Sequence, residues 1–307
     1  NGFAMTSRAA LAGAFLQRAG WADADRAFLA ADSSVRRYDR LRLADKTAVL
    51  MDAPPPYAED PQVFLNIASY LQKCGLSAPG CLAQDLQNGF LLLEDLGDGL
   101  FARLVTDDPP AEFRLYQMAT DVLAHLQRHA PPPDLPDLSA EDWAEAACFV
   151  LDWYRFAIVG DHVETSGLRR SIAESLRRYA DGPRVMILRD YHAENLLWLP
   201  DRVGLAQVGL LDFQLAQMGQ PGYDLVSLLQ DARRDVSSSV EAAMIEHFIS
   251  IGGHDPAGFR AAYAVLGAQR ALRIIGIFSR LCLKDGKPDY LKMIPRVWDQ
   301  LWRNLAN

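Results

Sequence analysis

The chain has 307 residues, of which 50% are hydrophobic and 23% are charged, and its formal net charge is −8. This composition is typical of a globular protein with one large domain or two smaller domains that have proper cores. We find neither a basic stripe nor an apolar run long enough to span a bilayer, so we expect no nucleic acid and no membrane as a partner.

The cysteines and the N-terminal stretch favour a cytoplasmic protein. None of the four cysteines has a zinc-like or disulfide-framework spacing, and a reducing compartment suits this usage best. Near the N-terminus, Leu11, Phe15 and Leu16 lie at helical spacing, which predicts an amphipathic helix ending at Gly20 and not a signal peptide. We expect a cytoplasmic monomer.

Up to about residue 96, the sequence predicts strands and one prominent helix. Asp60 and Pro61 have the residue types of a helix cap and first helical position, and Gly75 is expected to stop that helix after Lys73. Asn88–Gly89 is a strong hairpin signal between two apolar runs. The expected strands are residues 34–43, 46–53, 80–86 and 89–96.

After Gly97–Gly99 the pattern becomes mainly helical. We expect a two-lobed α+β protein with an N-terminal lobe at 1–96, a larger C-terminal lobe at 97–307 and a cleft where they join. Helices are predicted at 111–129, 140–159, 168–179, 240–251, 256–283 and 290–305, and short strands at 185–188 and 205–211.

Three polar residues follow these two short strands. Asp190 and Asn195 come after the first strand, and Asp212 comes after the second. Carboxylate and amide oxygens are the ligands that Mg²⁺ prefers, and phosphoryl transfer also needs a carboxylate at the acceptor hydroxyl. The spacing Asp-x-x-x-x-Asn followed by an apolar-Asp-Phe sequence is the pattern of the kinase catalytic and metal-binding loops. Either segment alone would be a weak signal, because such spacings occur by chance.

On these motifs the chain resembles the aminoglycoside and choline kinase-like phosphotransferases, which share the protein-kinase fold. The diagnostic stretches are "RDYHAENLLWLP" and "VGLLDFQLAQMGQPGYDLVSLLQDARRDV". Within that group, it is most similar to the bacterial kinases that phosphorylate N-acetylmuramate and N-acetylglucosamine at the anomeric hydroxyl. That closer similarity lies in "SSVRRYDRL", "VLMDAPP", "GFLLLEDLGD" and "RIIGIFSRLCLKDGKPDYL". The resemblance covers nearly the whole chain and implies a small antiparallel-sheet N-lobe and a mainly helical C-lobe.

The resemblance also implies roles for individual residues. Asp190 would be the catalytic base, Asn195 and Asp212 would hold Mg²⁺ on the phosphates of ATP, and Asp224 would brace the catalytic loop from behind. Backbone groups of the segment Glu94, Asp95 and Leu96 would contact the adenine.

The chain departs from the kinase pattern at the phosphates. There is no glycine-rich loop, so the hydroxyl and backbone N–H groups of Ser33 and Ser34 are the expected phosphate contacts. Met51 stands where kinases have a strand lysine, and Lys46 comes too early. Arg36 or Arg37 is our candidate for the missing cation, because a guanidinium binds phosphate well and only one of two neighbours on a strand can face the nucleotide. Its acidic or polar helper is Glu59 or Gln62, unless both are simply solvated helix-start residues.

For the acceptor, the helical lobe offers several alternatives. Glu145, Asp152 and Trp153 would share one face of a continuous helix, which suits sugar binding and equally suits a plain amphipathic helix. His192 either contacts the substrate or braces the loop. Arg273 and Arg280 share another face, where they either bind a substrate carboxylate or serve at the surface.

Three functions remain open from the sequence. The first is an ATP- and Mg²⁺-dependent kinase of an amino-sugar hydroxyl. The second is a phosphotransferase for aminoglycoside-like or choline-like acceptors. The third is a nucleotide-binding pseudokinase that regulates a partner; the missing lysine and glycine-rich loop favour it, and the presence of Asp190, Asn195 and Asp212 argues against it.

Overall fold

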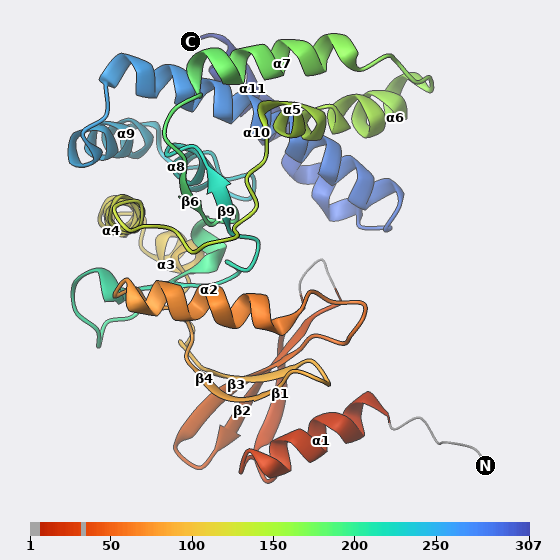
Figure 1. The fold of residues 1–307 in the computed structure, drawn as a ribbon, viewed down its shortest axis with the longest axis vertical. Helices are drawn as coiled ribbons and strands as arrows, with labels where there is room; N and C mark the ends of the chain where they lie inside the picture. The colour runs from red at the N-terminus through yellow and green to blue at the C-terminus, as the bar shows by residue number, and fades with distance from the viewer. Residues whose placement is uncertain (1–6, 32–34) are drawn as a thin grey trace. The chain divides into compact units, whose positions relative to one another are not determined.

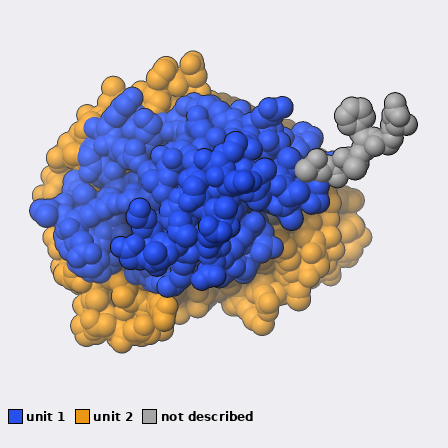
Figure 2. Space-filling view, turned by 90° about the horizontal axis from the view of Figure 1, so that it is seen from below, with its two compact units in different colours: residues 1–99, 197–214 blue, residues 100–196, 215–307 orange. Residues whose placement is uncertain are grey.

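The computed structural model describes residues 7–31 and 35–307, and the chain divides into two compact units, coloured separately in Figure 2. Unit 1 contains residues 1–99 and 197–214, and unit 2 contains residues 100–196 and 215–307. The predicted lobes were 1–96 and 97–307, so the division differs by residues 97–99 and by the segment 197–214, which packs with the sheet-containing unit.

Unit 1 is built on a five-stranded antiparallel sheet with the order β1-β2-β3-β5-β4. The predicted hairpin at Asn88–Gly89 is confirmed. Gly89 has φ +74°, and a Cβ at this position would lie 2.0 Å from the carbonyl oxygen of Ala53, so the turn requires glycine. The strands are β1 (Asp25–Ala31), β2 (Arg37–Leu43), β3 (Lys46–Asp52), β4 (Cys81–Asp85) and β5 (Phe90–Glu94).

Two helices cover this sheet, and Figure 1 shows α1 and α2 on opposite sides of it. Helix α1 (Arg8–Arg18) buries Phe15 against Leu41 and Leu50 of the sheet. Helix α2 (Pro61–Lys73) is the predicted one: the Asp60 side chain accepts the backbone N–H of Gln62 at 2.9 Å, and Pro61 is in the first turn. Burial on both faces explains why β3 and β5 are nearly continuous apolar runs.

The segment 197–214 belongs to unit 1 because of backbone contacts. It contains most of the two-stranded sheet formed by β7 (Leu196–Trp198) and β8 (Val208–Leu210). The N–H of Trp198 donates to the carbonyl of Gly99 at 2.7 Å, and the N–H of Leu210 donates to the carbonyl of Ser77 at 2.8 Å. These hydrogen bonds join residues 99 and 133 positions apart, which sequence patterns do not report.

Unit 2 is mainly helical, with a short antiparallel pair formed by β6 (Val185–Ile187) and β9 (Gln217–Gly219). The predicted continuous helix over 140–159 is wrong: the chain forms α5, then a π-helix at Val150–Arg155, then α6. The helices are α3 (Phe101–Asp107), α4 (Ala111–Leu126), α5 (Ala140–Ala147), α6 (Phe156–Val159), α7 (Ser166–Tyr179), α8 (Tyr223–Leu229), α9 (Ser238–Gly252), α10 (Pro256–Leu283) and α11 (Ile294–Leu305).

Helix α10 is the central helix of unit 2. Ile275 and Phe278 pack with Val297 and Leu301 of α11 in one hydrophobic core. Within the described part of the chain, α10 is the single helix long and apolar enough to cross a membrane, which amends the expectation that no apolar run reaches that length. Its apolar window is 67% buried inside the protein, as in a core helix.

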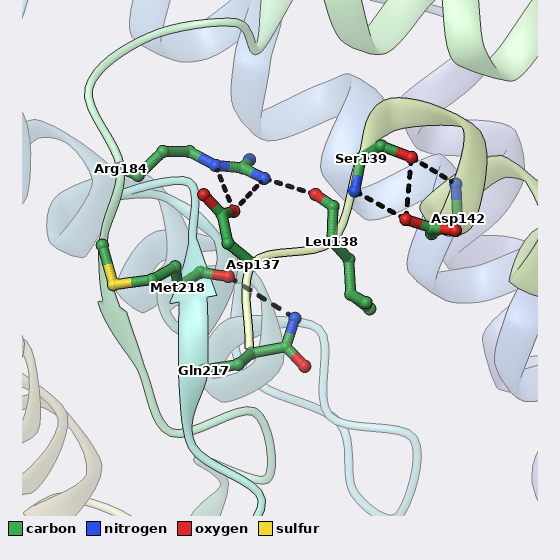
Figure 3. Close-up of polar contacts among 7 residues, drawn as sticks. All are labelled: Asp137, Leu138, Ser139, Asp142, Arg184, Gln217 and Met218. Carbon is green, nitrogen blue, oxygen red and sulfur yellow. Dashed lines mark hydrogen bonds and ion pairs between the residues drawn. The ribbon is translucent and has the colours of Figure 1, made fainter. Parts of the chain in front are cut away.

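The proline-rich link between α4 and α5 is attached to β9 (Figure 3). Asp137 forms a parallel bridge with Met218, and Arg184, just before β6, donates to the Asp137 carboxylate at 2.9 Å and also to the carbonyl of Leu138. Ser139 and Asp142 then form a capping box that begins α5. These contacts position the start of α5 relative to the β6–β9 pair.

Candidate active site

The loop after β6 is held from behind by a buried carboxylate. Asp224, at the start of α8, is 0% exposed and accepts the backbone N–H groups of Leu188 at 2.6 Å and Arg189 at 2.9 Å. Burial raises the pKa of Asp224 to about 7, against the effect of these two hydrogen bonds, which lower it. The bracing that the resemblance implied for Asp224 has a direct physical basis in these bonds.

Arg189 has an uncommon backbone conformation, with φ +72°. Its carbonyl accepts the hydroxyl of Ser227 at 3.1 Å, and its guanidinium donates to Gln217 Oε1 at 3.1 Å. Buried Arg270 of α10 in turn donates to Ser227 Oγ at 3.2 Å and to the carbonyl of Gln230 at 2.9 Å. The strained residue before Asp190 is therefore fixed at its N–H, its carbonyl and its side chain.

Asp190 itself is half-buried. Its N–H donates to the carbonyl of Leu188 at 2.9 Å. No described residue donates a hydrogen bond to its carboxylate, whose oxygens are not among the buried atoms that lack a partner. The carboxylate is thus accessible within unit 2, as a group that accepts a substrate proton must be.

The side chains of Asn195 and His192 contact each other within the loop. The amide nitrogen of Asn195 donates to the carbonyl of Asp190 at 2.9 Å and lies 3.3 Å from His192 Nε2, which orients the amide oxygen to the other side. His192 is 4% exposed, and burial, together with the nearby Arg233 and Arg270, lowers its pKa well below the usual value. Of the two roles considered for His192, these contacts favour bracing and not substrate contact.

Asp212 lies in unit 1, two residues after β8, with φ +55°. The next residue, Phe213, is fully buried and stacks on Phe64 of α2 with ring centroids 4.9 Å apart. Gln214 Nε2 donates to Asp212 Oδ1 at 2.6 Å. The carboxylate is therefore positioned by an aromatic anchor and an amide.

Arg36 lies beside Asp212 and Glu59. Its guanidinium is 4.0 Å from the Asp212 carboxylate and 3.7 Å from that of Glu59, and its side chain is 7% exposed. Arg37 points elsewhere: it is 54% exposed and donates to Asp39 at 2.9 Å. Of the two arginines considered, Arg36 has the surroundings that a phosphate-binding cation next to an acidic helper and a metal ligand needs.

The other residues expected near the missing lysine have separate roles. Met51 is buried in β3 opposite Tyr38, and Lys46 lies at the exposed start of that strand. Gln62 donates to Asn66 of its own helix at 2.9 Å, whereas Glu59 lies 3.7 Å from Arg36, so the contacts favour Glu59 as the predicted helper. Ser33 and Ser34, the expected phosphate-binding hydroxyls, lie outside the described residues.

The segment expected to contact adenine is shaped by its own side chains. The N–H of Glu94 donates to the carbonyl of Gly80 at 2.7 Å, and the Glu94 carboxylate accepts the N–H of Gly80 at 3.1 Å. The Asp95 carboxylate is buried and accepts from Arg40 at 2.9 Å. These side chains are structural, and the adenine contact of the Glu94–Leu96 backbone stays a prediction.

The acceptor residues predicted on 140–159 lie on two different helical elements. Glu145 is in α5, whereas Asp152 and Trp153 are in the π-helix, which turns less per residue than an α-helix and so changes the register. Glu145 is exposed and pairs with Arg169 of α7 at 2.9 Å. Asp152 is exposed and Trp153 half-buried. The regular α-helix on which the shared face was predicted is therefore interrupted, and the binding of the acceptor by these residues stays a prediction.

The oxygen atoms of the two predicted metal ligands, Asn195 and Asp212, are of the type that Mg²⁺ prefers. Asp212 of unit 1 has a carboxylate and Asn195 of unit 2 an amide oxygen, which are both hard oxygen donors, and their binding of one ion stays a prediction. No cluster of three or more His, Cys, Asp or Glu side chains occurs in residues 7–31 and 35–307, so an all-protein metal cage is absent from this part of the chain.

Comparison with known proteins gives the class. The model of the phosphotransferase enzyme family matches residues 25–261, and the chain belongs to this family. It is therefore an enzyme, a phosphotransferase of the kinase kind, as the sequence predicted.

Curated relatives and solved structures refine the comparison. The chain is 36% identical to an N-acetylmuramate/N-acetylglucosamine kinase of Caulobacter vibrioides, over 95% of this chain and 91% of the relative. It is 35% identical to one of Pseudomonas aeruginosa, over 92% and 85%. A choline/ethanolamine kinase family protein of Mesorhizobium loti has a TM-score of 0.64 at 15% identity, covering 98% of this chain and 94% of that one. The fold is thus the protein-kinase-like fold of this group, and the predicted resemblance is confirmed.

Proposed function

We propose that the protein transfers the γ-phosphoryl group of ATP to a hydroxyl of an amino sugar of the N-acetylmuramate or N-acetylglucosamine kind, at the anomeric position. Relatives of nearly the same length are named for these two sugars. The observation that carries the proposal is the braced loop of unit 2, where Asp190 has an accessible carboxylate after a backbone fixed by Asp224 and Ser227.

In this proposal Asp190 accepts or orients the proton of the sugar hydroxyl. Asn195 and Asp212 hold Mg²⁺, which supplies charge neutralisation at the phosphates when bound. Arg36 binds the phosphates in place of the strand lysine, with Glu59 as its acidic helper. The backbone of Glu94–Leu96 and the hydroxyls of Ser33 and Ser34 complete the nucleotide site. The protein works as a cytoplasmic monomer.

The alternatives have weaker support. The pseudokinase hypothesis was based on the missing strand lysine and glycine-rich loop. In our proposal the buried Arg36, near Asp212, takes the place of that lysine as the cation at the phosphates. Cationic acceptors such as aminoglycosides or choline favour acidic pockets, but Glu145 of α5 is paired with Arg169, and Glu141 is paired with Arg177. The absence of a strand lysine and of a glycine-rich loop still favours a pseudokinase, and the presence of Asp190, Asn195 and Asp212 argues against it.

The test is a panel of acceptors. The protein is incubated with ATP, Mg²⁺ and, separately, N-acetylmuramate, N-acetylglucosamine, an aminoglycoside and choline, while ADP release is followed. We expect turnover with the amino sugars and a loss of about 10²- to 10⁴-fold in Asp190→Asn. ATP binding without turnover on any acceptor would favour the pseudokinase, and full activity of Asp190→Asn would remove the role of Asp190.

A further inference from the structure

Helix α10 carries arginines that have no carboxylate partner. Arg260, near its start, pairs with Glu246 of α9, whereas no acidic group of a described residue lies within 4.0 Å of Arg270, Arg273 or Arg280. The two terminal nitrogens of Arg270 donate to the carbonyl of Gln230 and to Ser227 Oγ, while its Nε is buried without a partner among the described residues. Arg273 and Arg280 are half-buried, and a half-buried cation without a counter-ion is uncommon because desolvation penalises its charge.

Arg273 differs from Arg280 in having a neighbour that orients it. One terminal nitrogen of Arg273 donates to the hydroxyl of Tyr223 at 2.9 Å. Its other terminal nitrogen has no partner among the described residues and is not one of the buried atoms, so it reaches the surface of unit 2. Arg280 makes no side-chain hydrogen bond to any described residue.

A second unsatisfied donor lies at the same place. The ring of Tyr223 packs against that of Trp143 of α5 with centroids 5.0 Å apart. The indole N–H of Trp143 and the Nε–H of Arg273 are both buried without a partner among the described residues. Native proteins leave few buried donors unsatisfied, so two such donors on residues that both contact Tyr223 need an explanation, and an absent acceptor is one. Gln269 fixes the arrangement by donating to the carbonyl of Trp143 at 2.8 Å.

This cluster is tied to the catalytic loop through residues of the same unit. Tyr223 is the chain neighbour of Asp224, which holds Leu188 and Arg189. One turn before Arg273, Arg270 binds Ser227, which in turn binds the carbonyl of Arg189. Hydrogen bonds and one helical turn of α10 therefore connect Arg273 to Arg189, the residue before the proposed base.

We propose that Arg273, oriented by Tyr223, binds a carboxylate on the acceptor and selects anionic sugars. The proposal rests on the proposed function and deepens it, because the two acceptors named for the relatives differ in this group. N-acetylmuramate carries a lactyl ether with a carboxylate, and N-acetylglucosamine has a hydroxyl there. A charge-assisted hydrogen bond from the accessible nitrogen of Arg273 then favours the first sugar.

The experiment measures kcat/KM for both sugars, with ATP and Mg²⁺, in the native protein and in variants. We expect Arg273→Gln to lower the ratio of kcat/KM for N-acetylmuramate over that for N-acetylglucosamine by about 10- to 100-fold. For Arg273→Lys, which keeps the charge and loses the planar guanidinium, we expect a ratio between that of the native protein and that of Arg273→Gln. Arg260→Gln, which removes a charge from the same helix at a paired position, is the matched control and keeps the native ratio.

A neutral analogue separates charge from shape. The methyl ester of N-acetylmuramate has nearly the same shape without the charge, so the native protein discriminates against it and Arg273→Gln does not. An unchanged ratio in Arg273→Gln, or a fall in Arg280→Gln alone, overturns the assignment of Arg273 while leaving the kinase proposal intact. If the native protein phosphorylates neither sugar, the proposed function fails first and this inference fails with it.

Discussion

The carboxylate of Asp224 accepts the backbone N–H of Arg189 at 2.9 Å, and this bond fixes the residue immediately before Asp190. Arg189 has a left-handed backbone, which costs free energy for a residue with a side chain, so the conformation persists only because its surroundings determine it. The hydroxyl of Ser227 also fixes Arg189, because it donates a hydrogen bond to the carbonyl of that residue. The position of the proposed base thus depends on a fully buried ionisable group.

The raised pKa of Asp224 predicts a pH dependence of stability. Burial moves its pKa from 3.8 to about 7. Between these values the native chain keeps a proton that the unfolded chain has released, so the free energy of unfolding falls as pH rises from about 4 to 7 and is level above. The slope from this group is at most about 1.4 kcal/mol per pH unit.

We expect Asp224→Asn, which cannot titrate, to lose that part of the slope. Urea unfolding of both proteins at several pH values from 5 to 8 measures it. Because other buried acids titrate in both proteins, the difference between the two curves isolates Asp224. Parallel curves would show that the carboxylate is already ionised throughout, held by the two backbone N–H groups.

Arg36 and Arg37 provide a matched pair of adjacent arginines. Arg36 is buried near Asp212 and Glu59, and Arg37 is exposed beside Asp39. We expect Arg36→Ala to lower kcat/KM for ATP by about 10- to 100-fold, because a charge-assisted phosphate contact is lost, and Arg37→Ala to change it by less than about threefold. Steady-state kinetics with varied ATP decides the matter, and equal effects of the two substitutions would contradict the assignment.

Local turn and cap chemistry made much of the fold predictable. The hairpin at Asn88–Gly89 and the start of α2 at Asp60 follow from residue types within a few positions of each other. Strand β1 was not predicted, because all seven of its residues are exposed and its sequence lacks the alternation of a half-buried strand. The π-helix at Val150–Arg155 was also missed, since apolar spacing there resembles that of an ordinary helix.

The candidate site was predictable where a spacing carries the chemistry. Asp190, Asn195 and Asp212 stood out by their positions after short strands. The choice between Arg36 and Arg37 did not follow from the sequence, because it depends on tertiary contacts with Glu59 and Asp212. No sequence pattern indicated roles for Ser227 and Arg270. The hydrogen bond from Ser227 to Arg189 joins residues 38 positions apart, and that from Arg270 to Ser227 joins residues 43 positions apart.

The proposed role of Asn195 as a metal ligand predicts that its substitution changes the dependence of turnover on the Mg²⁺ concentration. If its amide oxygen binds the metal, Asn195→Ala raises the Mg²⁺ concentration for half-maximal turnover by about tenfold, besides lowering turnover by freeing the carbonyl of Asp190. The measurement is a Mg²⁺ titration after removal of divalent ions with a chelator. Asn66→Ala, at an exposed position of α2, is the control. Lower turnover with an unchanged Mg²⁺ midpoint would leave Asn195 a positioning role only.

A larger residue in place of Gly276 of α10 is expected to disturb the packing close to the π-helix. A Cβ built there lies 2.3 Å from the carbonyl carbon of Phe149 and 2.5 Å from its oxygen, so the backbone between α5 and the π-helix must move. We expect Gly276→Ala to lower the free energy of unfolding by about 1–3 kcal/mol, despite the better helix propensity of alanine. Gly13 of α1 is the matched control: a Cβ there meets no atom within 4 Å, so Gly13→Ala is expected to stabilise by about 0.5–1 kcal/mol. Denaturant unfolding measures both, and a stabilising effect at both positions would mean that α10 and Phe149 are less closely packed than described.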